Sequence, residues 1–239
     1  MLELVNVKKY YKNKPAVDGL NMTVKQGDVL GLLGMNGAGK STTISMIATL
    51  MKPDEGDILY EGKSIVRNPR CIRGELGLVP QEIALYTELS GMDNLRFWGR
   101  AYHINGGRLQ DRIHEVMDIT GLAEDVLKKK VKTYSGGMKR RLNIGAALLH
   151  RPRLVVMDEP TAGIDIVSRK RILDAIRILN IQGAAVLYTG HYMDEMEQIC
   201  SRFCVMDQGR ITAEGSKEEL LKQGAATLEQ FFLSSIDKG

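Results

Sequence analysis

The chain has 239 residues, of which 44% are hydrophobic and 26% are charged. This composition predicts a folded protein, large enough for one substantial core with a subdomain attached. The net charge is only +4 and basic residues stand among acidic ones, which argues against a nucleic-acid partner and favours solvated surfaces, including at the basic run 139–141.

Strand signals dominate the first third of the chain and return in the last third. Between about residues 91 and 149 they vanish and the apolar spacing is helical, which predicts an inserted helical subdomain. The predicted strands are residues 2–7, 20–24, 29–33, 58–60, 76–79, 154–157, 184–189 and 203–206, and the other predicted helices are residues 40–51, 168–179, 218–221 and 228–233. This alternation implies an α/β fold with a mostly parallel sheet covered on both faces.

A glycine-rich loop between the strand 29–33 and the helix 40–51 matches the pattern GxxxxGK[ST]. Its glycines let the backbone curl around phosphate oxygens, and the helix N-terminus adds partial positive charge. A chance match is the alternative, but the flanking strand and helix are the context that the motif requires. We expect Lys40 to reach the β- and γ-phosphates, Ser41 to bind Mg²⁺ and Thr42 to contact a phosphate. The predicted nucleotide-binding residues of the loop are Gly34, Asn36, Gly37, Ala38, Gly39, Lys40, Ser41 and Thr42.

Two adjacent acids, Asp158 and Glu159, follow the apolar strand 154–157. Carboxylates at the end of a buried strand need a cationic partner, and in a phosphate-loop ATPase that partner is Mg²⁺, held by Asp158 directly or through water. Glu159 is then placed to act as general base or to position the attacking water. A strand that simply reaches solvent is the alternative, which the upstream phosphate loop disfavours.

A third motif, Ser135-Gly136-Gly137, stands at the start of a predicted helix, where a hydroxyl and free N–H groups can form a second anion site. Taken alone it could be a flexible turn. Its surroundings resemble the LSGGQ signature of ABC (ATP-binding-cassette) ATPases, with Tyr134 in place of Leu and Met138 in place of Gln. By this resemblance we identify the chain as a member of that family.

The resemblance extends to further positions along nearly the whole chain. Tyr11 resembles the aromatic residue that stacks on adenine, although the adjacent Tyr10 and a role in the core stay open as alternatives. Gln81 resembles the Q-loop glutamine that senses Mg²⁺ and the attacking water, and Asp165 resembles the D-loop aspartate at the dimer interface. His191 resembles the switch histidine that bonds the γ-phosphate. The resemblance thus implies catalytic roles for Gln81, Glu159 and His191, and metal contacts from Ser41, Gln81 and Asp158.

The family fold implied here is a phosphate-loop NTPase (RecA-like) core with a mostly parallel sheet, an N-terminal antiparallel β part and an inserted helical subdomain. We expect one ABC ATPase domain over residues 1–239. Its core with the β part would cover residues 1–85 and 155–239, and its helical subdomain about residues 86–154.

One chain holds two phosphate-binding helix starts, near Lys40 and near Ser135. In the family two domains pack head to tail, so that Ser135 of one would cover the γ-phosphate held by Lys40 of the other. We expect ATP and Mg²⁺ to close such a dimer and hydrolysis to reopen it. The second nucleotide-binding subunit is expected to be a copy of the same chain, and a transmembrane permease subunit is expected to dock near Gln81 and residues 85–89.

The stretch from Lys40 to Ser135 is too short for a long coiled-coil arm, and only one phosphate loop is present. These features argue against the DNA-repair and translation-factor branches of the family. Residues 134–141, 190–197 and 228–233 are similar to bacterial drug-resistance and sodium-export ATPases, so we expect an exporter. A soluble ABC ATPase that serves a non-transport assembly, such as an iron–sulfur scaffold, is the alternative, and a module that has lost catalysis is a second one.

The sequence also bears on where the protein works. Its three cysteines form no CxxC pair, which indicates free thiols in a reducing compartment. We expect no signal peptide, and no apolar run approaches the roughly 18 residues of a membrane span. We therefore expect a cytoplasmic protein, peripheral on the inner face of the cell membrane, with no nucleic-acid partner.

Overall fold

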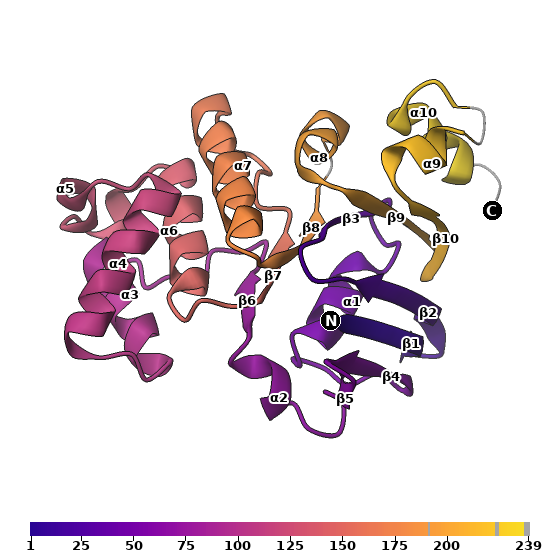
Figure 1. Cartoon of the computed structure of the whole chain (residues 1–239), viewed down its shortest axis with the longest axis horizontal. Helices are drawn as coiled ribbons and strands as arrows, with labels where there is room; N and C mark the ends of the chain where they lie inside the picture. The colour runs from indigo at the N-terminus through magenta and orange to yellow at the C-terminus, as the bar shows by residue number, and fades with distance from the viewer. Residues whose placement is uncertain (191, 223–224, 237–239) are drawn as a thin grey trace.

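The computed structural model describes residues 1–190, 192–222 and 225–236. Through its centre runs a six-stranded sheet with the order β10-β9-β3-β8-β7-β6 (Figure 1). Neighbouring strands are parallel, except that β10 pairs antiparallel with β9. The strands are β3 (Val29–Leu33), β6 (Leu76–Val79), β7 (Leu154–Asp158), β8 (Ala185–Thr189), β9 (Arg202–Asp207) and β10 (Arg210–Gly215).

Both faces of this sheet are buried, which explains why its central strands read as unbroken apolar runs. Successive side chains of a strand point to opposite faces. In β7, Val155 and Met157 pack into one hydrophobic core, and Leu154 and Val156 pack into another. The sheet therefore separates two cores, and its strands are fixed from both sides.

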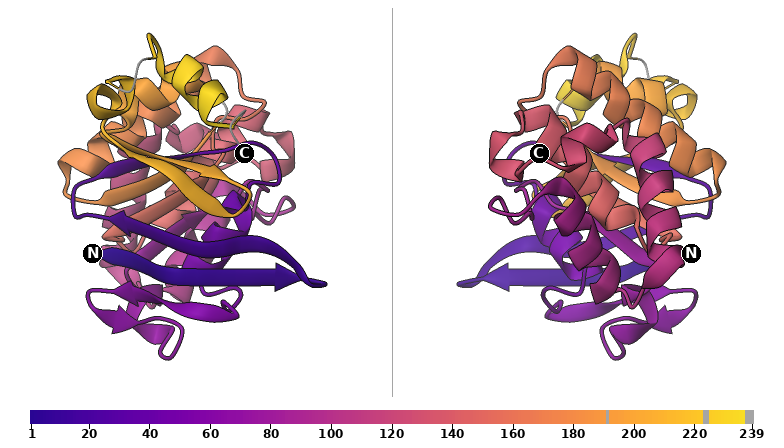
Figure 2. Two further views of the ribbon diagram at one scale, coloured as in Figure 1. Left: turned by 90° about the vertical axis from the view of Figure 1, so that its right-hand side faces the viewer. Right: turned by 90° about the vertical axis from the view of Figure 1, so that its left-hand side faces the viewer.

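A second, antiparallel sheet has the order β2-β1-β4-β5. Its strands are β1 (Leu2–Tyr11), β2 (Lys14–Val24), β4 (Glu55–Tyr60) and β5 (Lys63–Ser64). Together with helix α1 (Lys40–Ile47) it covers the core that contains Leu154 and Val156. The turned views of Figure 2 show this sheet below β9 and β10, with the C-terminal helices above them.

Helices α3 to α6 gather at one end of the molecule, away from the antiparallel sheet (Figure 1). They carry the apolar faces that the helical spacing of residues 91–149 predicts, and they close the second core. The remaining helices are α2 (Arg70–Arg73), α3 (Gly91–Ala101), α4 (Gly106–Thr120), α5 (Glu124–Leu127), the 3₁₀ helix η1 (Val131–Thr133), α6 (Gly136–Leu148), α7 (Ile166–Ile181), α8 (Met193–Ile199), α9 (Lys217–Leu221) and α10 (Leu228–Ile236).

The predicted class, an α/β fold with a mostly parallel sheet and an N-terminal antiparallel part, is confirmed. Several bounds differ from the prediction. The helix predicted over 40–51 ends at Ile47, because Thr49 adopts a left-handed φ of 57° that a helix cannot continue. The first two strands are longer than predicted and form a hairpin, because the added residues 8–11 and 14–19 do not alternate clearly between apolar and polar. Strand β10 and helices α2 and α8 were not predicted, since each is short and partly polar.

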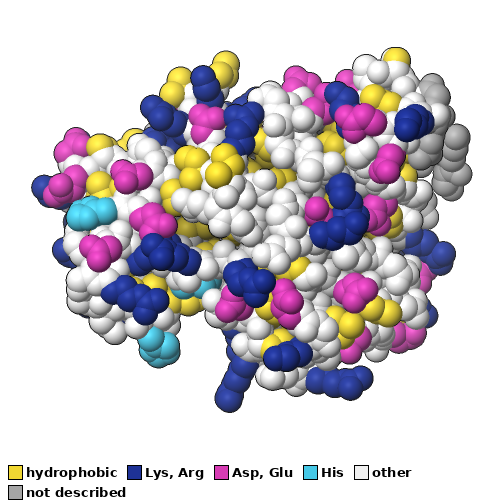
Figure 3. All heavy atoms as spheres, in the orientation of Figure 1, with side chains coloured by type: hydrophobic (Ala, Val, Ile, Leu, Met, Phe, Trp, Pro, Cys, Tyr) yellow, Lys and Arg dark blue, Asp and Glu magenta, His cyan; other side chains and the backbone are white. Residues whose placement is uncertain are grey.

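Within the described residues, no helix combines the length and the apolar character that a membrane span requires. On the face drawn in Figure 3, Lys and Arg side chains are interspersed with Asp and Glu and do not merge into one basic patch.

Candidate functional site

One cavity lies where the carboxyl ends of the central parallel strands meet, the edge at which open α/β sheets bind their ligands. It has a volume of about 550 Å³. Segments far apart in the sequence contribute to it: the hairpin of β1 and β2, the loop before α1, the end of β6 and the end of β7. The lining residues are Tyr11, Ala16, Asn36, Gly37, Gly39, Lys40, Ser41, Thr42, Gln81 and Glu159.

The loop between β3 and α1 keeps its curled shape through its glycines. Gly39 has a φ of 106°, and a Cβ there would lie 2.3 Å from the carbonyl oxygen of Ala16. Gly37 has a φ of 85°, and no atom lies within 4 Å of its Cβ position, so this part of the loop opens toward free space. Because α1 starts at Lys40, the loop delivers the unpaired N–H groups of a helix start to the cavity.

The Lys40 side chain is buried, and its ammonium group lies against the loop itself. Nζ donates hydrogen bonds to the carbonyl oxygens of Gly34 at 2.7 Å and Met35 at 3.2 Å. Burial lowers the pKa of Lys40, while the nearby carboxylates of Glu159 and Asp158 act in the opposite direction. An anion bound in the cavity would add negative charge next to the buried Lys40 ammonium group and so stabilise it.

The two acidic residues at the end of β7 are fixed by the neighbouring strand β8, in which Thr189 pairs with Asp158. The Thr189 hydroxyl donates to Asp158 Oδ1 at 2.7 Å and accepts from the Glu159 backbone N–H at 3.0 Å. Glu159 has a φ of 47°, a conformation that costs energy in a residue with a side chain and often marks functional sites. From the end of β6, Gln81 Nε2 donates to Glu159 Oε2 at 3.0 Å.

The structure thus brings Tyr11, the phosphate loop, Gln81 and Glu159 to one cavity, as the sequence predicts. Gly34 and Ala38 belong to the same loop but do not line the cavity. Asp158 immediately precedes Glu159 in the chain and does not line the cavity either. His191, predicted as the switch histidine, lies outside the described residues.

The signature segment lies elsewhere on the surface. Ser135 caps α6 by accepting a hydrogen bond from the Met138 N–H at 3.2 Å, so the predicted helix start is confirmed. Ser135 and Gly136 are exposed, whereas Gly137 is buried against α7, where a Cβ would lie 2.0 Å from Ser168 Oγ. None of the three signature residues lines the cavity within the same chain.

Arg140 is a site residue that the sequence analysis misplaced on a solvated face. It is 5% exposed, and its guanidinium donates from α6 to the carbonyl oxygens of Pro80 at 2.7 Å and Gln81 at 2.5 Å. Burial lowers the pKa of Arg140, and the carboxylates of Asp158 and Glu159 partly offset this. The signature helix is therefore tied directly to the loop that carries Gln81. Its helical spacing relative to the apolar Ile144 was the signal that could have placed Arg140 inside.

An apolar surface borders the same loop. A cavity of about 220 Å³ lies between the end of β6 and helices α3 and α6, with Trp98 and Tyr102 in its wall. Beside it, Tyr86 and Phe97 are about half exposed and pack edge to face with ring centroids 4.8 Å apart. We call the exposed side chains of Tyr86, Leu89 and Phe97 the apolar patch.

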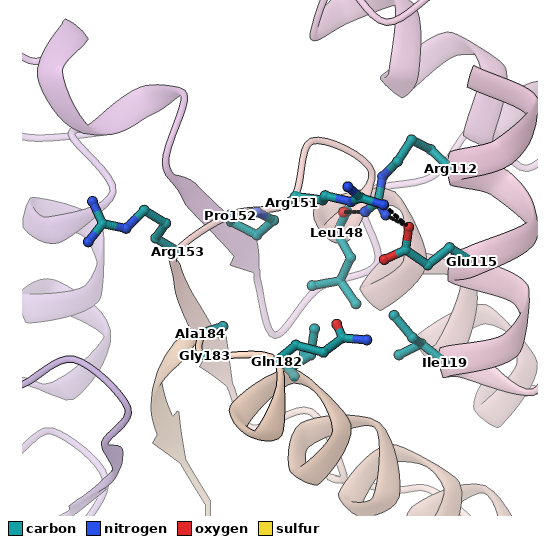
Figure 4. A pocket seen from close by; sticks show the side chains of 11 residues that line it. Arg112, Glu115, Ile119, Leu148, Arg151, Pro152, Arg153, Gln182, Gly183 and Ala184 are labelled. Carbon is teal, nitrogen blue, oxygen red and sulfur yellow. Dashed lines mark hydrogen bonds and ion pairs between the residues drawn. The ribbon is translucent and has the colours of Figure 1, made fainter. Parts of the chain in front are cut away.

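A further cavity, of about 340 Å³, lies between α4, α7 and the start of β7, away from the phosphate loop (Figure 4). Arg112 lies at its wall, bridging the carbonyl oxygen of Leu148 and the carboxylate of Glu115, to which Arg151 also binds. Arg153 points away from it. The Arg112 side chain thus connects α4 to the end of α6.

The curled loop, the buried lysine and the strand-end carboxylates define a phosphate-loop nucleotide-binding protein. The family model described as ABC transporter matches residues 17–162, and the chain belongs to this family. It is accordingly an ATP-binding subunit and an ATPase. ATPase subunits of this kind dimerise and work with transmembrane partners.

Curated relatives resemble it over nearly its whole length. The linearmycin resistance ATP-binding protein LnrL of Bacillus subtilis is 47% identical over 100% of this chain and 76% of its own length. The daunorubicin/doxorubicin resistance ATP-binding protein DrrA of Streptomyces peucetius is 41% identical over 92% of this chain and 66% of its own length. The Nod factor export ATP-binding protein I of Rhizobium sp. is 38% identical over 96% of this chain and 76% of its own.

Solved structures agree with this assignment. An ATP-binding subunit of an ABC transporter superimposes with a TM-score of 0.89 at 28% identity and covers 98% of this chain and 99% of its own. A dimeric post-hydrolysis state of the cassette MJ0796, bound to ADP and Pi, superimposes with a TM-score of 0.82 at 26% identity, over 90% of this chain and 98% of its own.

Proposed function

We propose that the chain powers an exporter from the cytoplasmic face of a membrane, as one of two identical nucleotide-binding subunits that close on ATP. The resistance and export roles in the names of its relatives support the direction of transport. The observation that carries the dimer is the separation of two anion-binding helix starts. Lys40 lies in the cavity, while Ser135 and Gly136 are exposed outside it, so a second subunit must bring its own signature segment to the phosphate.

The predicted site residues have the following proposed roles. Lys40 and the loop N–H groups bind the β- and γ-phosphates, and Tyr11 stacks on adenine. Glu159 accepts a proton from the attacking water or orients it, and Gln81, bonded to Glu159, helps place that water. His191 bonds the γ-phosphate. The signature residues Ser135, Gly136 and Gly137 cover the γ-phosphate of the partner subunit.

Magnesium fits the oxygen donors in this cavity and beside it. Ser41 offers a hydroxyl, Gln81 an amide oxygen, and Asp158 a carboxylate that is 7% exposed, and hard cations prefer such oxygen ligands. The ion would neutralise charge on the β- and γ-phosphates as they separate.

We further propose a division of the single domain: a core of residues 1–85 and 155–239 and a helical subdomain of about residues 86–154. The gathering of α3 to α6 at one end of the molecule supports it (Figure 1). The transmembrane permease subunit docks on the apolar patch, because apolar side chains that remain exposed beside the Gln81 loop suit a protein partner. Arg140, which joins that loop to the signature helix, would transmit the docking to the dimer interface.

The test is Glu159→Gln, which keeps the shape of the side chain and removes its basicity. We expect turnover to fall by a factor of about 100 or more, with ATP binding retained. Size-exclusion chromatography with light scattering should then show a dimer with ATP and Mg²⁺ and a monomer without them.

The matched control is Glu3→Gln, an exposed position on β1, which should keep normal turnover. A Glu159→Gln protein that binds ATP and stays monomeric would contradict the proposed function.

A further inference from the structure

A buried carboxylate outside the cavity, that of Glu195 on α8, has no role in the chemistry described so far. The residue is 4% exposed. Its Oε2 accepts a hydrogen bond from Thr161 Oγ1 at 2.6 Å and another from the Tyr188 hydroxyl at 3.2 Å. Its Oε1 lies 2.9 Å from Arg169 Nε, in an ion pair. A buried charge persists only where such partners compensate the loss of water, so the position of this carboxylate is tightly fixed.

The partners of Glu195 come from the segments that surround the catalytic carboxylates. Thr161 follows Glu159 by two residues, and Arg169 lies in the first turns of α7. Thr161 therefore directly precedes the segment 162–165, and Arg169 follows it by four residues, within α7. The segment ends in Asp165 and leads from the cavity to the exposed start of α7. Tyr188 precedes Thr189, whose hydroxyl bonds the Asp158 carboxylate and the Glu159 backbone N–H.

Arg169 adds a second link between the same elements. Its guanidinium lies over the Tyr192 ring, 4.3 Å from the ring centroid, and Tyr192 is the residue at which α8 is capped. Helices α7 and α8 lie side by side (Figure 1). The two contacts of Arg169 fasten the start of α7 to the start of α8, while Glu195 is anchored to β8 through Tyr188.

We propose that Glu195 is a positioning residue for ATP hydrolysis: its carboxylate holds Thr161 and Arg169, which lie on either side of the segment 162–165, and so sets the place of Asp165 relative to Glu159. Glu195 does not line the cavity, so it acts through Thr161 and Arg169 and not on the nucleotide. The proposal rests on the proposed function, in which the segment 162–165 lies at the interface of the closed dimer.

The test compares Glu195→Gln with Glu197→Gln. Both residues lie on α8 and both side chains are ion-paired, but Glu197 pairs at the surface with Lys217 at 2.7 Å. We expect Glu195→Gln to lower kcat about tenfold with KM changed less than about twofold, since the carboxylate acts on the geometry of the segment 162–165 and makes no contact with the nucleotide. Glu197→Gln should leave both constants unchanged.

A double-mutant cycle with Arg169→Gln separates positioning from general stability. If Glu195 and Arg169 act as one unit, the double variant should lose no more kcat than the more severe single variant. An unchanged kcat in Glu195→Gln, or losses that multiply in the double variant, would overturn the proposal. Should Glu195→Gln fail to fold, Arg169→Gln alone decides the matter by its kcat, because the Arg169 side chain is 27% exposed and tolerates replacement.

The dimer assay distinguishes failure of this inference from failure of the proposed function. In the Glu159→Gln background, adding Glu195→Gln should raise the ATP-dependent dimer dissociation constant about tenfold. If the Glu159→Gln protein alone does not dimerise, the proposed function fails. If it dimerises and Glu195→Gln changes neither dimerisation nor kcat, only the role of Glu195 fails.

Discussion

Two adjacent tyrosines at the end of β1 differ in what they can reach. Tyr11 lines the cavity together with the phosphate loop, and its hydroxyl lies 3.4 Å from Met51 Sδ. Tyr10 does not line the cavity, and its backbone N–H is bonded to Asp54 Oδ2 at 2.7 Å. The geometry therefore favours Tyr11 as the residue that stacks on adenine.

We expect Tyr11→Ala to raise the dissociation constant for ATP about tenfold, because one aromatic stack on a base contributes roughly 1–3 kcal/mol. Fluorescence titration with a labelled nucleotide measures this. Tyr10→Ala is the matched control and should change the constant less than about twofold. The opposite ranking of the two variants would assign the stack to Tyr10.

The start of α6 packs closely against the start of α7 at Gly137. Ser168 Oγ lies 2.0 Å and Asp165 Oδ2 lies 3.0 Å from the position that a Cβ would take. Asp165 itself caps α7 by accepting from the Ser168 N–H at 2.9 Å, which lowers the pKa of Asp165. The second glycine of the signature is thus required by packing, whereas a Cβ on the first, Gly136, would make only an ordinary contact.

We expect Gly137→Ala to lower the free energy of unfolding by about 1–3 kcal/mol, since an extra methyl group forces the two helices apart. Chemical denaturation measures this. Gly136→Ala should leave stability nearly unchanged, because its Cβ would meet only Ile164 Cδ1 at 3.9 Å. Equal stability losses in the two variants would show that the contact between α6 and α7 is not the cause.

The start of α7 presents apolar side chains on the surface of the molecule. Ile166 is 81% exposed and Val167 is 73% exposed, directly after the segment 162–165. Two apolar side chains this exposed beside Asp165 suit burial in the ATP-dependent dimer.

We expect Ile166→Asp in the Glu159→Gln background to raise the dimer dissociation constant about tenfold or more, since a charge replaces apolar surface at the interface. Analytical ultracentrifugation with ATP measures it, and ATP binding by the monomer should persist. Ile181→Asp is the control, because Ile181 is 85% exposed at the other end of the same helix. A dimer weakened equally by both changes would place the interface elsewhere.

Features that depend only on neighbouring residues could be predicted from the sequence. The curl of the phosphate loop, the start of α1 at Lys40 and the cap of α6 by Ser135 follow from glycine conformations and from hydrogen bonds over a few residues. The apolar run of β7 likewise predicted a buried strand that ends in two acidic residues.

Which distant segments meet depends on how the whole chain packs. The order β3-β8-β7-β6 brings Gln81 to Glu159 and Thr189 to Asp158, and the packing of α6 on the end of β6 buries Arg140, whose charge had suggested a solvated face. The network of Glu195 depends in the same way on how α7 and α8 pack on β8. Such contacts arise from the burial of two cores against one sheet, and no local pattern encodes which polar side chains that burial brings together.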